Sequence, residues 1–174
     1  INTLGLSKNE ALAQQAYIAL TVNLAGLLAT FPAGKLSDRF SKKAILYFTC
    51  AVSIVGGLSF ALAGSPQAAL LAAAIFGLGY GAFTAVDWAL VCNVLPPGGA
   101  AKYMGLWGFA DIVPQIVAPF IGGLFAAWSI AQHGPANGYR YVMFLAIFWF
   151  ALGTLCLRFV RERRVHSVTL SASD

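Results

Sequence analysis

The sequence predicts an all-α integral membrane protein with five transmembrane helices. Of its 174 residues, 59% are hydrophobic and 10% are charged, and the mean hydropathy is +0.76. Charged residues make up about 25% of an ordinary soluble domain. The apolar residues are gathered into five long runs, and about 20 consecutive apolar residues can cross a bilayer as a helix. The composition therefore excludes a soluble fold.

Short polar segments separate the five apolar runs. The charged segment 34–43 follows the first run, and the turn 64–67 follows the second. A segment with two prolines and two glycines, starting at Pro96, follows the third run, and the polar segment 132–138 follows the fourth. The expected spans are residues 13–33, 44–63, 68–94, 105–130 and 139–160, followed by a polar tail at 161–174.

Lysine and arginine residues are concentrated in alternate connections. They occur in segment 34–43, at Lys102 and in the tail, but they are absent from segments 64–67 and 132–138. Because lysine and arginine accumulate in cytoplasmic loops, we expect segment 34–43 and the C-terminus to be cytoplasmic, in a plasma (inner) membrane. The N-terminus then lies outside. Since the chain starts at Ile1 without a signal peptide, we expect a preceding helix to be missing.

The sequence contains no motif of an enzyme or of a cofactor-binding protein. It has no glycine pattern for dinucleotides or phosphates and no zinc-ligand spacing. Cys50, Cys92 and Cys156 lie far apart and fit small apolar positions, while His133 and His166 fall outside the expected spans. The basic residues flank the apolar runs without forming a continuous face, which argues against nucleic acid as a partner. We expect no catalytic residue, no cofactor and no metal site.

Polar and small residues in the third span recur on one helical face. Gly77, Tyr80, Thr84, Asp87 and Val91 are separated by steps of three and four residues, which places them on one side of a helix. Polar side chains at membrane depth face a bundle interior or an aqueous cavity, because lipid offers them no hydrogen-bond partner. We therefore take Tyr80, Thr84 and Asp87 as candidates for a solute or proton site.

Two further spans add residues to this candidate site. The fourth span repeats the pattern with Asp111 and Gln115, and the first carries a milder version around Asn23. Asp87 and Asp111 have two interpretations. Each either couples a proton or binds a solute hydroxyl, or it is a structural carboxylate near the cytoplasmic end of its helix, paired with a base or capping that end.

Glycines and prolines inside the spans indicate how the helices pack and bend. Gly77 and Gly81, four residues apart, allow two helices to approach closely, and Gly79 lies between them. Helix packing is the expected role of all three. Pro114 and Pro119 each remove a backbone donor inside the fourth span, so we expect a helix bend there, which either works as a gate or only shapes the helix.

Segment 34–43, which reads Gly34-Lys35-Leu36-Ser37-Asp38-Arg39-Phe40-Ser41-Lys42-Lys43, resembles the signature loop of the major facilitator superfamily. That loop joins the second and third helices of a six-helix half. The second glycine of the pattern is Ser41 here. A serine has a narrower range of φ than a glycine, so we expect a more restricted backbone at this turn position. By resemblance, the matching residues of this conformational gate are Gly34, Asp38, Arg39, Lys42 and Lys43.

The resemblance also assigns the chain to one half of that fold. Segment 86–96, with segments 105–107 and 114–119, is similar to the tenth and eleventh helices of the branch that contains sucrose/proton symporters. Asn93 stands where an acid is common in that branch, so the role of that acid is not carried over. Residues 1–174 are then a partial C-terminal six-helix bundle, helices 8 to 12 of twelve, and the N-terminal half is a missing partner.

The family resemblance implies a permease that moves a small polar solute, with a sugar as the first expectation, by alternating access coupled to protons. Asp38 would face the positive N-terminal end of the helix that starts near Gly105, and Arg39 would pair locally. Two alternatives remain open at this point. The same fold could export drugs or metabolites, which a more aromatic cavity would favour, or it could serve as a sensor or assembly protein without transport.

Overall fold

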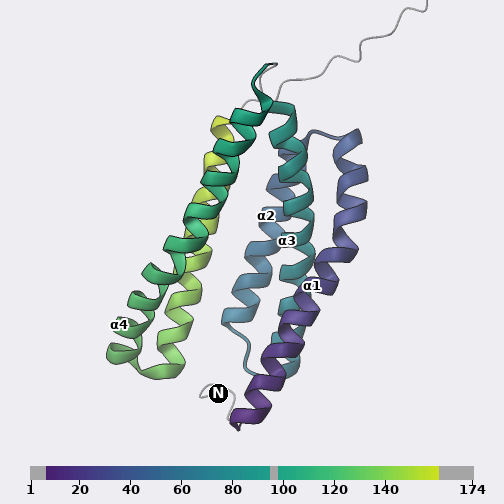
Figure 1. Ribbon diagram of the computed structural model, residues 1–174. Coiled ribbons are helices and arrows are strands. Elements are labelled where there is room, and N and C mark those ends of the chain that lie inside the picture. The colour runs from purple at the N-terminus through teal and green to yellow at the C-terminus, as the bar shows by residue number, and fades with distance from the viewer. Residues whose placement is uncertain (1–6, 95–97, 161–174) are drawn as a thin grey trace, which may run out of the picture.

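The computed structural model describes residues 7–94 and 98–160, and these residues form helices and no strands. The helices are α1 (Lys8–Arg39), α2 (Lys42–Ala61), α3 (Pro66–Val94) and α4 (Ala100–Cys156), and α4 ends in the short 3₁₀ helix η1 (Leu157–Phe159) (Figure 1). The tail expected at 161–174 lies outside the described residues.

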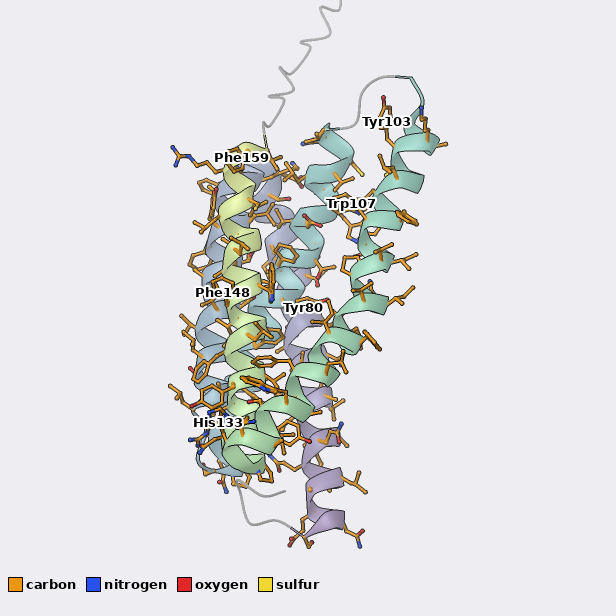
Figure 2. The ribbon with its side chains drawn as sticks, turned by 90° about the vertical axis from the view of Figure 1, so that its left-hand side faces the viewer. Tyr80, Tyr103, Trp107, His133, Phe148 and Phe159 are labelled. Carbon is orange, nitrogen blue, oxygen red and sulfur yellow. The ribbon has the colours of Figure 1, made fainter. Side chains whose placement is uncertain are left out.

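α4 is a helical hairpin. Its backbone leaves helical geometry only at Gly134, where φ is 76° and ψ is 165°. The chain reverses there into a first arm, Ala101–Pro135, and a second arm, Asn137–Phe159. The arms meet at this reversal and diverge toward their other ends (Figure 2). The reversal is tighter than the loop expected at 132–138, because a glycine at positive φ turns the chain within one residue.

The described chain therefore has five helices long and apolar enough to cross a membrane. These are Asn9–Arg39, Lys42–Ala61, Pro66–Val94 and the two arms of α4. This confirms the predicted all-α membrane fold with five spanning helices. His133, expected outside the spans, lies within α4, and its ring is 4.8 Å from the ring of Tyr141 in the second arm.

The charged segment 34–43 is more helical than the sequence predicted. α1 continues to Arg39 and α2 begins at Lys42, so only Phe40 and Ser41 separate the two helices. Ser41 is the N-cap of α2, and its hydroxyl accepts a hydrogen bond from the Ala44 amide at 3.4 Å. The φ of Ser41 is −57°, which is open to any residue, so this position does not need the glycine of the family pattern.

α1 also begins earlier than expected, because a capping box starts it. The Ser7 amide donates to the Glu10 carboxylate at 2.9 Å, and the Glu10 amide donates to the Ser7 hydroxyl at 3.4 Å. These two bonds satisfy amides that the first turn of a helix leaves free. α1 therefore begins at Lys8, in a polar turn that precedes the apolar run.

α3 is the central helix, and it packs against α1 on one side and α2 on the other. Glycines bring α1 and α3 together: a Cβ built on Gly81 would lie 2.6 Å from the carbonyl carbon of Gly26, and one built on Gly77 would lie 2.5 Å from the carbonyl oxygen of Val22. A Cβ on Gly79 would lie 2.6 Å from the Ser53 amide of α2. The packing role predicted for the three glycines of α3 is confirmed.

Side chains from the first three helices form a buried cluster near the end of the bundle where α1 ends and α2 begins. Its members are Ala33, Ile45, Leu46, Ala82, Val86 and Leu90. α4 is attached more loosely, chiefly through contacts between its second arm and α2. The first arm is almost wholly exposed, as shown by Phe109, Ile116 and Phe120, each 66% to 70% exposed.

The contact between α1 and α3 predicts that a single methyl group on Gly81 destabilises the bundle. Gly81→Ala should lower the free energy of unfolding in detergent by about 1 to 3 kcal/mol, the usual cost of overpacking. The measurement is loss of helical circular dichroism on titration with a denaturing detergent. Gly123→Ala in α4 is the matched control, since its Cβ would meet no atom within 4 Å. Equal stability of the two variants would contradict the proposed tight contact.

Candidate functional site

The polar face predicted for the third span lies along α3. Tyr80 and Thr84 are exposed and Asp87 is half-buried. The Thr84 hydroxyl donates to the carbonyl of Tyr80 at 2.9 Å, and the Tyr80 ring stacks on Phe76 at 5.8 Å between centroids. In the view of Figure 2, Tyr80 is seen through the opening between the two arms of α4. α3 thus presents an aromatic surface and one acid on this side.

Asp111 and Gln115 lie on the first arm of α4. Both are exposed, and the Gln115 amide donates to the Asp111 carboxylate at 3.2 Å. Within residues 7–94 and 98–160, neither acid forms an ion pair. Asp87 and Asp111 thus lie on two different helices, and the hydrogen bond of Asp111 is made within its own helix.

Asn23 does not join this group of side chains. It is exposed on α1, and its amide donates to the Ala19 carbonyl of the same helix at 2.7 Å. Thr30, one helical turn beyond Gly26, donates to the Gly26 carbonyl at 2.9 Å and lies 3.4 Å from the Gly81 carbonyl of α3. The polar face of the first span is therefore divided, with Gly26 and Thr30 in the contact to α3 and Asn23 left at the surface.

Pro114 and Pro119 lie in the exposed first arm of α4. The backbone keeps helical dihedral angles at both, since Gly134 is the position in α4 that departs from them. The helix therefore continues through both prolines. A bend that works as a gate stays a prediction.

The signature segment is held by short-range hydrogen bonds. The Ser37 hydroxyl donates to the carbonyl of Gly34 at 2.7 Å, and Lys42 donates to the carbonyl of Ser37 at 3.2 Å. Lys42 thereby satisfies a carbonyl in the last turn of α1, where a positive charge also complements the helix dipole. Asp38 and Arg39 are exposed in the same turn.

The expected contact between Asp38 and the start of α4 is not made in this arrangement. Asp38 is exposed, and a Cβ built on Gly105 would meet no atom within 4 Å. The role of Asp38 as a conformational latch therefore stays a prediction for another arrangement of the helices.

Lys43 has a role that the sequence analysis missed. Its ammonium group donates to the carbonyl of Arg158 at 3.0 Å and to that of Val160 at 2.9 Å. Both carbonyls belong to the end of the second arm of α4, where the last turn of a helix leaves acceptors unsatisfied. The start of α2 is thereby tied to the end of the last span. A basic residue 115 positions away from its acceptor gives no local sequence signal.

Two apolar cavities were also missed, because four helices far apart in the sequence form them. The larger, about 330 Å³, is lined by Ile18, Val22, Ser53, Ile54, Gly57, Phe60, Ala73, Phe76, Met143, Ala146, Ile147 and Phe150. The smaller, about 250 Å³, is lined by Cys50, Phe83, Trp149, Phe150, Gly153, Thr154 and Leu157. Among the described residues, no group of three His, Cys, Asp or Glu side chains could hold a metal ion.

Comparison with known proteins identifies relatives along the whole chain. The profile described as the Major Facilitator Superfamily matches residues 2–174. The multidrug resistance protein MdtL of Shewanella oneidensis is 33% identical over 156 residues, which is 85% of this chain and 36% of that protein. MdtL of Shewanella sp. (strain ANA-3) is 29% identical over 161 residues, 90% of this chain and 39% of that protein.

A relative of lower identity is also named as a multidrug resistance protein. Multidrug resistance protein 3 of Bacillus subtilis is 25% identical over 100 residues, 58% of this chain and 19% of that protein. The chain thus spans less than two thirds of the length of the curated relatives it matches. No solved structure matches the chain at the same level of significance.

The Lys43 contacts predict that this side chain stabilises the end of the last span. Lys43→Met should weaken that end by about 1 kcal/mol, the upper range for a cation at a helix C-terminus. Hydrogen–deuterium exchange should then become faster in the last turns of the second arm. Lys35→Met is the control, since Lys35 lies over the Phe31 ring of its own helix at 4.5 Å. Unchanged exchange in Lys43→Met would contradict the capping role.

Proposed function

The chain belongs to the Major Facilitator Superfamily, and from this we propose that it forms part of a secondary transporter that exports small amphipathic molecules by alternating access. The observation that carries this proposal is the stacked pair Phe76 and Tyr80 on α3, on the same helix as Asp87. The surfaces around them are apolar and aromatic. We assign the chain to helices 8 to 12 of a twelve-helix protein, whose N-terminal half would complete the translocation pathway.

The proposed solute differs from the sugar expected from the symporter-like residues, because the site has few polar groups. Asn23 and Thr84 already donate to carbonyls of their own helices. A sugar needs several free donors and acceptors around it, since a buried hydroxyl without a partner costs about 1 to 3 kcal/mol. Tyr80 stacked on Phe76 and the apolar side chains of the first arm suit an amphipathic solute better. The relatives named as multidrug resistance proteins support the same choice.

The two carboxylates are the proposed proton site. A charged side chain at membrane depth costs about 2.5 to 3.5 kcal/mol on insertion scales. Asp87 and Asp111, without an ion-pair partner in the described chain, are therefore suited to take up a proton on one side and release it on the other. By the distribution of Lys and Arg, we place the protein in the plasma membrane with the signature segment and the C-terminus in the cytoplasm.

Asp87 is expected to be needed for transport driven by a proton gradient. In the whole protein reconstituted in vesicles, Asp87→Asn should abolish solute accumulation under an imposed pH gradient and spare exchange of solute across the membrane. The readout is uptake of a fluorescent lipophilic cation. Thr21→Val in α1 is the control, because its hydroxyl bonds to the Tyr17 carbonyl of its own helix and it lies outside the candidate site. Unchanged accumulation in Asp87→Asn would make this acid a structural residue, and no solute movement in the unaltered protein would favour a sensor or assembly protein.

Asp38 is expected to control the rate of the conformational cycle. Asp38→Asn should reduce transport by at least about tenfold, because a neutral amide loses most of the attraction to a positive helix end. Insertion into the membrane should remain normal, as measured by the amount of folded protein recovered. Lys35→Gln, in the preceding turn of α1, is the control. Near-normal transport by Asp38→Asn would remove the latch from the mechanism.

A further inference from the structure

The turn of α4 holds a histidine between aromatic rings of both arms. Between ring centroids, His133 lies 4.8 Å from Tyr141 of the second arm and 6.4 Å from Trp128 of the first arm. Figure 2 shows His133 at the end of the hairpin where the two arms meet. The histidine is exposed, so its ring is open to water. The contact between the arms thus includes a side chain that can exchange a proton.

One ring nitrogen of His133 faces a backbone carbonyl. Its Nδ1 lies 3.3 Å from the carbonyl oxygen of Ser129, one turn earlier, and Ser129 is fully buried. Because a carbonyl only accepts, this bond needs a proton on Nδ1. A neutral imidazole carries its single proton on either nitrogen, whereas the protonated ring carries one on both. Protonation therefore ensures the donor, and a charge-assisted bond is also shorter, at about 2.7 to 2.9 Å.

His133 also lies at the C-terminal end of a helical segment. The next residue, Gly134, has a φ of 76°, and a glycine at positive φ commonly follows the last residue of a helix. The free carbonyls of a last turn carry partial negative charge, which attracts a protonated histidine. A cation is also attracted to an aromatic ring within about 6 Å, a distance that Tyr141 satisfies. Three contacts of His133 thus become stronger when its ring gains a proton.

The neighbouring segments bring few other charged groups to this end of the bundle. On the second arm, Arg140 precedes Tyr141 and opposes a second positive charge nearby. Residues 51–61 of α2 carry no titratable side chain, and in α3 none precedes Tyr80. At the start of α1, which lies at the same end (Figure 1), the titratable residues are Lys8, Glu10 and Tyr17. Among the described residues of this end, His133 is the one whose residue type ordinarily changes charge between about pH 5 and 8.

We propose that His133 is a pH-sensitive clamp between the two arms of α4. The protonated ring donates to the Ser129 carbonyl and lies against Tyr141, which holds the turn closed, and loss of the proton weakens both contacts. Because the arms diverge from this turn (Figure 2), their contact here sets how far apart their other ends lie. In the orientation proposed above, the turn lies on the outer side of the membrane, where acid would fasten the hairpin. The clamp itself does not depend on that orientation.

The test is hydrogen–deuterium exchange of the whole protein in mild detergent at about pH 5.5 and about pH 7.5, on either side of the usual histidine pKa. Each rate is divided by that of the free peptide at the same pH. Protection of residues 126–142 should be about threefold to tenfold greater at the lower pH, the effect of a cation at a helix end and an aromatic ring. His133→Gln should remove this difference, and His166→Gln, the other histidine of the chain, is the control that should keep it. Equal protection at both pH values in the unaltered protein, or an unchanged difference in His133→Gln, would overturn the proposal.

A second pair of variants keeps the test decisive if His133→Gln fails to fold. Tyr141→Leu removes the ring across the arms and should reduce the pH difference about twofold or more, whereas Tyr141→Phe keeps an aromatic face and should retain it. Helical circular dichroism is measured for each variant to show that α4 is formed. A packing role of Tyr141 alone would change protection equally at the two pH values. PH differences of equal size in Tyr141→Leu and Tyr141→Phe would overturn the clamp.

Discussion

The close approach of α1 and α3 is the contact on which the rest of the bundle depends. Lipid is as apolar as the helix surfaces, so hydrophobic burial does not draw spans together, and van der Waals contact at short range must do so. Gly26, Gly77 and Gly81 remove the side chains that would hold the two backbones apart. The Gln14 amide also joins the starting end of α1 to the Pro66 carbonyl of α3 at 3.1 Å.

Fixing α3 in this way determines where its acid and its aromatic surface point. Its glycines are used in the contacts with α1 and α2, while Tyr80 and Thr84 are left exposed. The first arm of α4 is barely packed, and its polar pair, Asp111 and Gln115, is held internally. The closely packed helices α1, α2 and α3 carry a loosely attached hairpin, α4. In a carrier, such an arrangement allows the hairpin to shift against the other helices.

Features that repeat along one helix could be predicted from the sequence, whereas features that join distant segments could not. Hydropathy gave the five spans, because a spanning helix needs about 20 apolar residues. The face predicted for α3 is divided, since Gly77 and Val91 are buried while Tyr80 and Thr84 are exposed. The start of α1 at Lys8 was missed although the Ser7 and Glu10 capping pair is a local signal. Lys43 on Arg158, the two cavities and the separation of Asn23 from the acids could not be predicted, because they depend on how the helices pack in space.

The one-residue reversal at Gly134 makes the pairing of the two arms of α4 depend on a single backbone conformation. A φ of 76° with a ψ of 165° is open almost only to glycine. Beyond the turn, a Cβ on Gly138 would lie 2.7 Å from Ile130 of the first arm. With no connecting loop between them, the two arms form one helical hairpin, and a side chain at either glycine would force them apart at the turn.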